Sequence, residues 1–251
     1  MTVPNSTSLP GRKRPALVIR AMRRLWRLTV DPAFRHMTWF RVLHSRDVFQ
    51  PFNDTKPNRY PRIFSFVQSQ LSVDARLRLL SYGCSTGEEV FSLSNYFPNA
   101  AVKGVDINPG NIAVCRRRLK RTPDSAISFE TASSTHAEPD AAYDAIFCMA
   151  VLRHGDLGQP GVTRCDHLIE FEGFASAVAD FARCLKPGGL LIIRYSNFRF
   201  CDTATAANFA TVLSVPFPVN GQRTPIFGPD NRLMRGIEYT DTVFRKKSPA
   251  P

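Results

Sequence analysis

The pattern of hydrophobic and polar positions changes most sharply between residues 77 and 97, which read LRLLSYGCSTGEEVFSLSNYF. An apolar run around Leu79 ends abruptly in small residues from Gly83 to Gly87, and apolar residues then recur at helical spacing from Val90 onward. This pattern predicts a strand, a tight turn and a helix, with glycine where the backbone turns sharply or approaches a ligand. Unpaired N–H groups at the start of such a helix can bind a polar or anionic ligand, although glycine turns also serve purely structural purposes.

The same alternation continues along the chain. Apolar runs predict strands at residues 101–106, 126–129 and 190–194, and another from residue 143. Helical spacing predicts helices at residues 111–120, 174–185 and about 205–213. The KPGG turn at 186–189 is expected to end the second of these helices, and residues 225–247 to form a closing hairpin. Alternating strands and helices predict a parallel sheet covered by helices, with a ligand at the carboxyl ends of its strands.

The strand at 101–106 ends in Asp106, about 20 residues after the glycine turn. An acid at the tip of the strand beside such a turn can accept hydrogen bonds from two sugar hydroxyls. We therefore predict that Asp106 binds the ribose of a nucleotide-like ligand. The alternative is a solvated aspartate at the end of a strand.

The GCSTGEE stretch resembles motif I of the class I S-adenosylmethionine-dependent methyltransferases, in the wording shared with chemotaxis-receptor-type methyltransferases. Residues 143–152 (YDAIFCMAVL) and the LKPGG turn resemble later markers of this family, and the resemblance covers residues 58–247. It implies an α/β fold: a Rossmann-like, seven-stranded, mostly parallel sheet with an antiparallel last strand. An N-terminal helical extension would precede this sheet.

The resemblance also implies S-adenosylmethionine as the cofactor. The glycine turn would hold its methionine portion, and this turn consists of Gly83, Cys84, Ser85, Thr86 and Gly87. Asp106 would hold the ribose, Ile107 would lie against the adenine, and Met149 and Ala150 would flank the reaction centre. Motif I often has an acid where this chain has Ser81, and Glu88 would supply the missing carboxylate. Arg59 loosely matches an arginine that reaches the cofactor in the receptor enzymes.

Departures from the family pattern reduce the number of activities that the sequence favours. The receptor methyltransferases have Arg-Asn where this chain has Met149-Ala150, which argues against a strict receptor-modifying enzyme. No N-P-P-Y motif is present, which disfavours methylation of nucleic-acid bases. A plain dinucleotide-binding enzyme is disfavoured because the turn lacks the third glycine of G-x-G-x-x-G. His154 lies just past the fourth strand, where it could act as a general base, with a structural or solvated histidine as the alternative.

We therefore expect a methyltransferase that moves a methyl group to an O or N nucleophile, most readily of a small molecule. A nucleic-acid acceptor is not expected. Two alternatives stay open. The protein could methylate a protein carboxyl or side chain, or it could bind S-adenosylmethionine without turnover as a regulatory protein recruited by its N-terminal helix.

Composition adds little to this picture outside the N-terminus. Hydrophobic residues make up 43% and charged residues 22%, as in ordinary globular proteins. No apolar run approaches the roughly 20 residues that span a bilayer, and no secretory signal is recognisable, so a cytoplasmic location is expected. The six cysteines are scattered without a C-x-x-C pair, which predicts buried reduced thiols and no metal site.

Positive charge is concentrated near the N-terminus. Residues 11–46 contain ten Arg or Lys against one acid, Asp31, and so account for +9 of the net charge of +12. We divide the chain into a disordered leader (1–15), a helical and aromatic extension serving as lid or substrate wall (16–75), and the methyltransferase domain (76–251). Apolar and arginine residues alternate at helical spacing from Ala16, and Asp31 precedes the proline that stops this helix. Its apolar face could dock onto the domain, its arginines could contact an anionic membrane or acidic partner, or the segment could be a targeting peptide.

Overall fold

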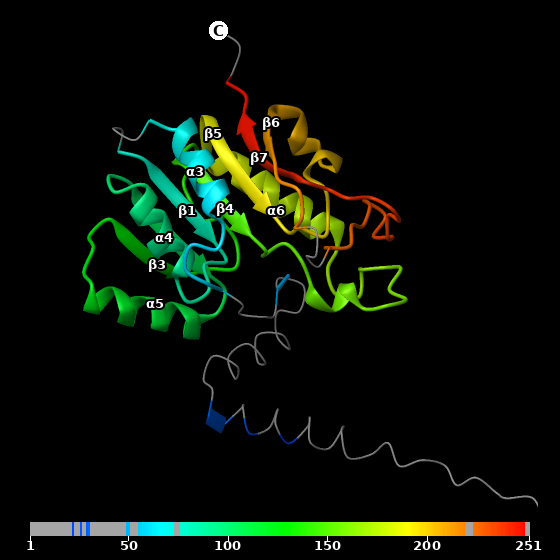
Figure 1. Ribbon diagram of the computed structural model, residues 1–251, viewed down its shortest axis with the longest axis horizontal. Helices are drawn as coiled ribbons and strands as arrows, with labels where there is room; N and C mark the ends of the chain where they lie inside the picture. The colour runs from blue at the N-terminus through cyan, green and yellow to red at the C-terminus, as the bar shows by residue number, and fades with distance from the viewer. Residues whose placement is uncertain are drawn as a thin grey trace, which may run out of the picture.

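A computed structural model describes residues 22, 26, 29, 30, 49, 50, 55–72, 76–218 and 223–248. In this part of the chain seven strands form one sheet in the order β3-β2-β1-β4-β5-β7-β6 (Figure 1). The strands are β1 (Arg78–Tyr82), β2 (Ala101–Asp106), β3 (Ile127–Thr131), β4 (Tyr143–Met149), β5 (Leu185–Arg194), β6 (Phe209–Ser214) and β7 (Asp241–Lys246). The α-helices are α3 (Pro61–Gln70), α4 (Glu88–Tyr96), α5 (Pro109–Arg121) and α6 (Phe171–Cys184). Short 3₁₀ turns are η1 (Gly155–Gly158), η2 (Phe200–Asp202) and η3 (Ala204–Asn208).

The strand directions confirm the predicted fold class. Strands β1 to β5 pair with their neighbours in parallel. Strand β7 enters between β5 and β6 and is antiparallel to both. The predicted antiparallel closing strand is therefore present, although it occupies an inner position and β6 forms the edge.

Side chains of the central strands alternate between two buried layers, as the two-residue period of a strand requires. On one face, Ile146 and Cys148 of β4 pack in a cluster with Phe174 and Phe181 of α6. On the other face, Phe147 of β4 belongs to a cluster that includes residues of α3, α4 and α5. Figure 1 shows α6 behind the sheet and α3 in front of it. A sheet covered on both faces explains why its strands read as continuous apolar runs.

Helix α3 lies within the predicted extension 16–75 but contributes to the core of the sheet. Its residues Ile63, Phe64 and Val67 are all at most 3% exposed and pack in the same cluster as Leu79 of β1. The ring of Phe64 meets that of Phe147 edge-on, with centroids 5.8 Å apart. The packed domain thus includes residues before position 76.

The helix expected around residues 205–213 is wrong. Residues 204–208 form η3, and Phe209 begins strand β6. The physical reason is tertiary: β7 leaves an edge of unpaired backbone groups, and residues 209–214 pair with it. The β-branched residues Thr211 and Val212 favour this extended conformation.

The KPGG segment also differs from expectation. Instead of a turn between helix and strand, β5 begins at Leu185 directly after α6. Strand β5 pairs Leu185 with Tyr143 and Leu190 with Ala145, so residues 186–189 bulge out of the ladder. Gly188 has φ +75°, a conformation that side chains disfavour, which explains why this bulge needs glycine.

All six cysteines are free thiols, five of them buried and Cys201 exposed. No helix among the described residues is both long and apolar enough to cross a bilayer. The leader 1–15 and most of the basic segment 11–46 lie outside the described residues. Of the predicted N-terminal helix, Met22, Trp26 and Val30 are described as helical and are 64%, 65% and 54% exposed. The rest of the predicted apolar face, including Val18, Ile19 and Leu25, lies outside the described residues, so docking of this face onto the domain stays a prediction.

Candidate functional site

The strand order reverses between β1 and β4, and the predicted site residues gather at the carboxyl ends of the strands there. Strand β1 leads into the glycine turn, β2 ends at Asp106, and β4 ends at Met149. In open α/β sheets ligands bind at this reversal point. The topology therefore brings together the residues that the sequence separates by more than 60 positions.

The glycine turn is held in a shape that only glycine adopts easily. Gly83 has φ +72°, and Gly87 has φ +93° at the N-cap of α4. A Cβ added to Gly83 would lie 2.4 Å from Cγ2 of Val151. The N–H groups of Gly83 and Cys84 donate to the carbonyl of Val105 at 2.8 and 2.9 Å, which fixes the turn against β2.

Ser85 has a hydroxyl without a partner. Its Oγ is buried and makes no hydrogen bond in the described part of the chain, and its backbone is held at φ +50°. A buried hydroxyl is normally hydrogen-bonded, so an orphaned one in a turn of this kind points to a polar group of a ligand. Thr86 differs, because its Oγ1 donates to Glu88 Oε2 at 2.7 Å.

Asp106 is 7% exposed. It connects the glycine turn to the second turn of the site, which follows β2 at the start of α5. Its Oδ2 accepts from the N–H of Ser85 at 2.8 Å, and its Oδ1 accepts from Asn108 N at 2.8 Å and from Asn111 Nδ2 at 3.0 Å. Burial raises its pKa, and these three hydrogen bonds oppose that shift. The carboxylate thus holds the site together. Its Oδ1 already accepts two hydrogen bonds, whereas Oδ2 accepts one and keeps lone-pair capacity for one more donor.

The carboxylate beside Ser81 comes from Glu89, which the sequence analysis missed. Ser81 Oγ donates to Glu89 Oε1 at 2.8 Å. Glu88, predicted for this place, instead accepts from Thr86 and lies 3.6 Å from Arg118 Nη1. Burial raises the pKa of Glu89 from 4.5 to about 7, with Ser81 and then Arg59 opposing the shift. The sequence carried no signal that distinguishes Glu89 from Glu88, because only the contact with Ser81 on β1 selects between these neighbours.

Arg59 reaches the same region because its neighbour is fixed to α4. Asn58 donates its N–H to Ser92 Oγ at 2.9 Å and accepts from Tyr96 Oη at 3.1 Å. The guanidinium of Arg59 lies 5.4 Å from the ring centre of Tyr60 and within electrostatic range of Glu89. The structure thus brings Arg59 to the end of the glycine turn.

The remaining predicted residues line the same edge of the sheet. Ile107 is half-buried directly after β2, Met149 is 8% exposed at the end of β4, and Ala150 has φ +62° with its N–H donating to Arg194 O. Cys84 is 3% exposed, and a hydrogen bond with Cys115, together with burial, raises its pKa. Its side chain therefore contributes packing and no reactive thiolate.

His154 is 5% exposed and caps η1. Its Nδ1 accepts from the N–H of Asp156 at 3.3 Å, and its own N–H donates to Asn197 Oδ1 at 2.7 Å. In a neutral imidazole whose Nδ1 accepts a hydrogen bond, Nε2 carries the proton. This arrangement favours the structural role over that of a general base.

We therefore expect His154→Asn to preserve methyl transfer to within about threefold, because asparagine caps a turn well and only the imidazole is lost. His154→Ala removes the cap and is expected to lower the free energy of unfolding by about 1 kcal/mol. Turnover with the eventual acceptor and urea unfolding measure the two effects. A loss of turnover of 100-fold or more in His154→Asn would instead support His154 as the general base.

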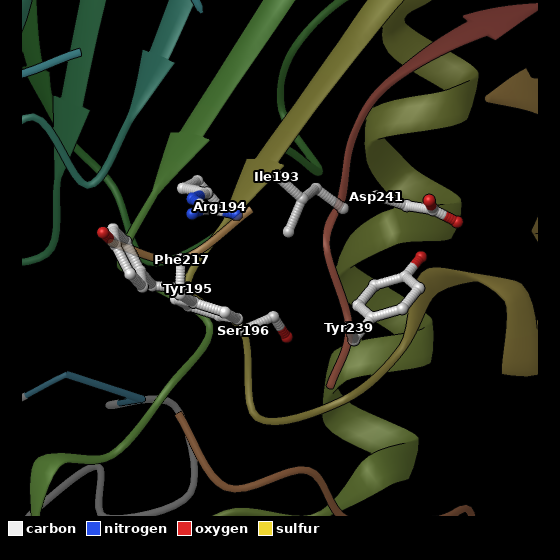
Figure 2. A pocket seen from close by; sticks show the side chains of 7 residues that line it. All are labelled: Ile193, Arg194, Tyr195, Ser196, Phe217, Tyr239 and Asp241. Atoms are coloured by element: carbon white, nitrogen blue, oxygen red, sulfur yellow. The ribbon is translucent and has the colours of Figure 1, made fainter. Parts of the chain in front are cut away.

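A pocket beside this site lies at the carboxyl end of β5 (Figure 2). Its lining residues are Ile193, Arg194, Tyr195, Ser196, Phe217, Tyr239 and Asp241. The guanidinium of Arg194 lies 4.7 Å from the ring centre of Tyr195 and 4.6 Å from that of Phe217. The sequence analysis did not identify this pocket, because Phe217 reaches β5 only through tertiary contacts.

Comparisons with known proteins agree with this geometry. Residues 80–193, from β1 to β5, match the family model described as a methyltransferase domain. The chain is 29% identical over 126 residues to a trans-aconitate 2-methyltransferase of Methylobacterium nodulans, which covers 50% of this chain and 41% of that protein. It is 27% identical over 161 residues to a demethylmenaquinone methyltransferase of Tropheryma whipplei, with 60% and 59% covered. The chain thus spans about half the length of the curated relatives it matches.

Among solved structures, the YcgJ protein from Bacillus subtilis superposes with a TM-score of 0.47 at 11% identity, covering 76% of this chain and 100% of that one. The family match over residues 80–193 agrees with the predicted resemblance to methyltransferases and supports S-adenosylmethionine as the cofactor, whereas the domain bounds 76–251 stay a prediction. The likeness to the chemotaxis-receptor-type subgroup stays a prediction.

Proposed function

We propose, from the premise that residues 80–193 form a methyltransferase domain, that this protein is an S-adenosylmethionine-dependent methyltransferase acting on an O or N nucleophile of a small molecule. The observation that supports it best is the glycine turn between β1 and α4. There an orphaned Ser85 hydroxyl, Gly83 at φ +72° and the Asp106 carboxylate lie together at the reversal point of the sheet.

The residues present fit this cofactor. Gly83 to Gly87 would hold the methionine portion, and the Ser85 hydroxyl would gain the partner it lacks. Glu89, rather than Glu88, would face the methionine ammonium, and Arg59 its carboxylate. Asp106 would accept a hydrogen bond from a ribose hydroxyl at Oδ2, which now receives only one, and Ile107 would lie against the adenine.

The bound cofactor would supply a methyl group already activated by its sulfonium. The chain then has to position the acceptor in line with that methyl and exclude water, and an effective pose contributes several kcal/mol to catalysis. Met149 and Ala150 would flank the reacting atoms. A separate general base is not required when the acceptor is a carboxylate oxygen, which carries no proton, or a neutral amine nitrogen, which releases its proton to solvent after the methyl transfer.

A small-molecule acceptor is favoured by the comparisons. Both curated relatives named above are methyltransferases named for small molecules, although each is matched over only part of its length. A protein side chain as acceptor is the alternative that an acceptor screen would decide.

Calorimetric titration with S-adenosylhomocysteine tests the cofactor site through Glu89. Because the pKa of Glu89 is about 7 in the free protein, the carboxyl is neutral below that pH and must lose its proton to pair with the ligand ammonium. The affinity of the wild type should therefore rise about tenfold per pH unit from pH 5.5 to 7 and then level off. Glu89→Gln should bind with little pH dependence and at least tenfold more weakly at pH 7.5.

The same variant has an opposite effect on stability. The pKa of Glu89 is about 7 in the folded protein and 4.5 in the unfolded chain. Its burial therefore does not affect stability below pH 4.5, begins to destabilise the fold above pH 4.5, and has its full destabilising effect above pH 7. Glu89→Gln should thus be more stable than the wild type at pH 8, by roughly 2–3 kcal/mol, and equal to it near pH 4. A folded wild type that binds no S-adenosylhomocysteine at any pH would contradict the proposed methyltransferase function. Tight binding without transfer across a broad acceptor panel would favour the regulatory alternative.

We also propose that the N-terminal helix contacts an anionic membrane surface. Met22, Trp26 and Val30 are exposed at helical spacing, and the sequence places arginines between them. The full chain should sediment with vesicles containing phosphatidylglycerol but not with pure phosphatidylcholine vesicles, and Trp26→Glu should abolish this binding. Absence of sedimentation at low salt would leave an acidic protein as the partner.

A further inference from the structure

Two polar groups beside the cofactor turn have no partner. Nε of Arg153 and Oη of Tyr60 are buried, and neither makes a hydrogen bond within the described residues. They come from separate segments, because Tyr60 precedes α3 and Arg153 follows β4, yet they lie within electrostatic range of each other. Two orphaned donors that converge from distant segments indicate a bound acceptor group.

Two other partly buried arginines among the described residues have hydrogen-bond partners for their guanidinium groups. Arg183 donates to the carbonyl of Glu138 at 2.8 Å, and Arg199 pairs with Asp202 at 2.6 Å. The charged and titratable groups that face Arg153 are a second cation, Arg59, and the phenols Tyr60 and Tyr195. Burial is the main cause that lowers the pKa of Arg153, and Arg59 lowers it further, so an anion beside Arg153 would oppose this shift.

Aromatic rings continue from this cationic position. The ring centre of Tyr195 lies 6.2 Å from that of Tyr60 and 5.6 Å from that of Phe217. Figure 2 shows Arg194, Tyr195 and Phe217 grouped at the end of β5. Arg194 donates to the carbonyls of Val215 and Pro216, which holds Phe217 in this place. Flat apolar surface thus adjoins two cationic groups.

We propose that Arg153 and Tyr60 form the carboxylate-binding subsite of the acceptor pocket, and that the acceptor is a small planar molecule bearing a carboxylate. This inference rests on the proposed methyltransferase function. The planar guanidinium of Arg153 matches a carboxylate in geometry and charge. The Tyr60 hydroxyl donates a second hydrogen bond, and the rings of Tyr195 and Phe217 contact the planar body of the acceptor.

Benzoate is a suitable probe, with benzamide as its neutral isostere. The full chain, saturated with S-adenosylhomocysteine, is titrated with each compound by calorimetry or by NMR. We expect saturable binding of benzoate at least tenfold tighter than of benzamide. Arg153→Met should weaken benzoate binding tenfold or more, and Tyr60→Phe about threefold. Arg117→Met, at an exposed position of α5, is the matched control and should leave it unchanged.

Equal binding of benzoate and benzamide, or unchanged benzoate binding in Arg153→Met, would overturn the subsite. So would a tenfold loss of S-adenosylhomocysteine affinity in Arg153→Met, because Arg153 would then serve the cofactor. Titration of the wild type with S-adenosylhomocysteine alone separates the two proposals. Binding of S-adenosylhomocysteine without benzoate refutes only the subsite, whereas a folded protein that binds no S-adenosylhomocysteine refutes the methyltransferase and the acceptor role together.

Discussion

Asp106→Ala should lower the free energy of unfolding by roughly 3 kcal/mol or more and abolish cofactor binding. The substitution removes the acceptor of three donors, namely Ser85 N, Asn108 N and Asn111 Nδ2. Each buried donor left without a partner costs about 1–3 kcal/mol, and the lost burial of a charge offsets part of the sum. For a domain of this size the melting temperature should fall by about 10 °C.

The matched control for this variant is Asp124→Ala. Asp124 also accepts a backbone N–H, that of Ala126 at 2.9 Å, but it lies in an exposed turn before β3. Its substitution should cost well under 1 kcal/mol, because water replaces the lost acceptor. If Asp106→Ala unfolded like the wild type, the carboxylate would not hold the two turns together, and any loss of binding would then report the ribose contact alone.

Gly83→Ala should be the second severe variant, costing roughly 3 kcal/mol in stability and at least 100-fold in S-adenosylhomocysteine affinity. Two effects combine: an alanine at φ +72° is strained by about 1–2 kcal/mol, and its Cβ would overlap Cγ2 of Val151 at 2.4 Å. Forcing such an overlap costs typically 1–3 kcal/mol. Denaturant unfolding and calorimetry measure the two losses.

A double-mutant cycle separates these effects. Val151→Ala removes both Cγ atoms and should recover the steric part of the loss in Gly83→Ala, giving a coupling energy of about 1–2 kcal/mol. Gly161→Ala isolates the strain, because Gly161 has φ +84° and a Cβ there would meet nothing within 4 Å. Absence of coupling between positions 83 and 151 would contradict the close packing of the turn against the segment after β4.

The affected turn is also the part of the site that could be predicted best. Local sequence was sufficient to predict the turn at Gly83 and Gly87 and the position of Asp106 at the end of a strand, because glycine conformation and strand ends are properties of short segments. It was not sufficient for Glu88 and Glu89. Adjacent residues of a helix point in directions about 100° apart, and only the position of Ser81 on β1 selects Glu89.

Functional roles that were predicted from residue type alone agree least well with the structure. Histidine is a common general base, yet the Nδ1 of His154 caps η1. No role was predicted for its neighbour Arg153, because nothing in the sequence distinguishes this arginine from the many others. Its importance comes from burial beside Tyr60 without a partner, which is a property of the packed molecule.

The sequence by itself predicted the strands and helices from β1 to β5, the glycine turn and the resemblance of residues 80–193 to a methyltransferase domain, because periodicity and turn chemistry are local. Tertiary structure decided the edge strand β6, the bulge at 186–189, the choice of Glu89 and the pocket at the end of β5. Each of these depends on backbone pairing or side-chain contacts between segments far apart in the chain. Such contacts outweigh local propensities, which differ by less than about 1 kcal/mol per residue.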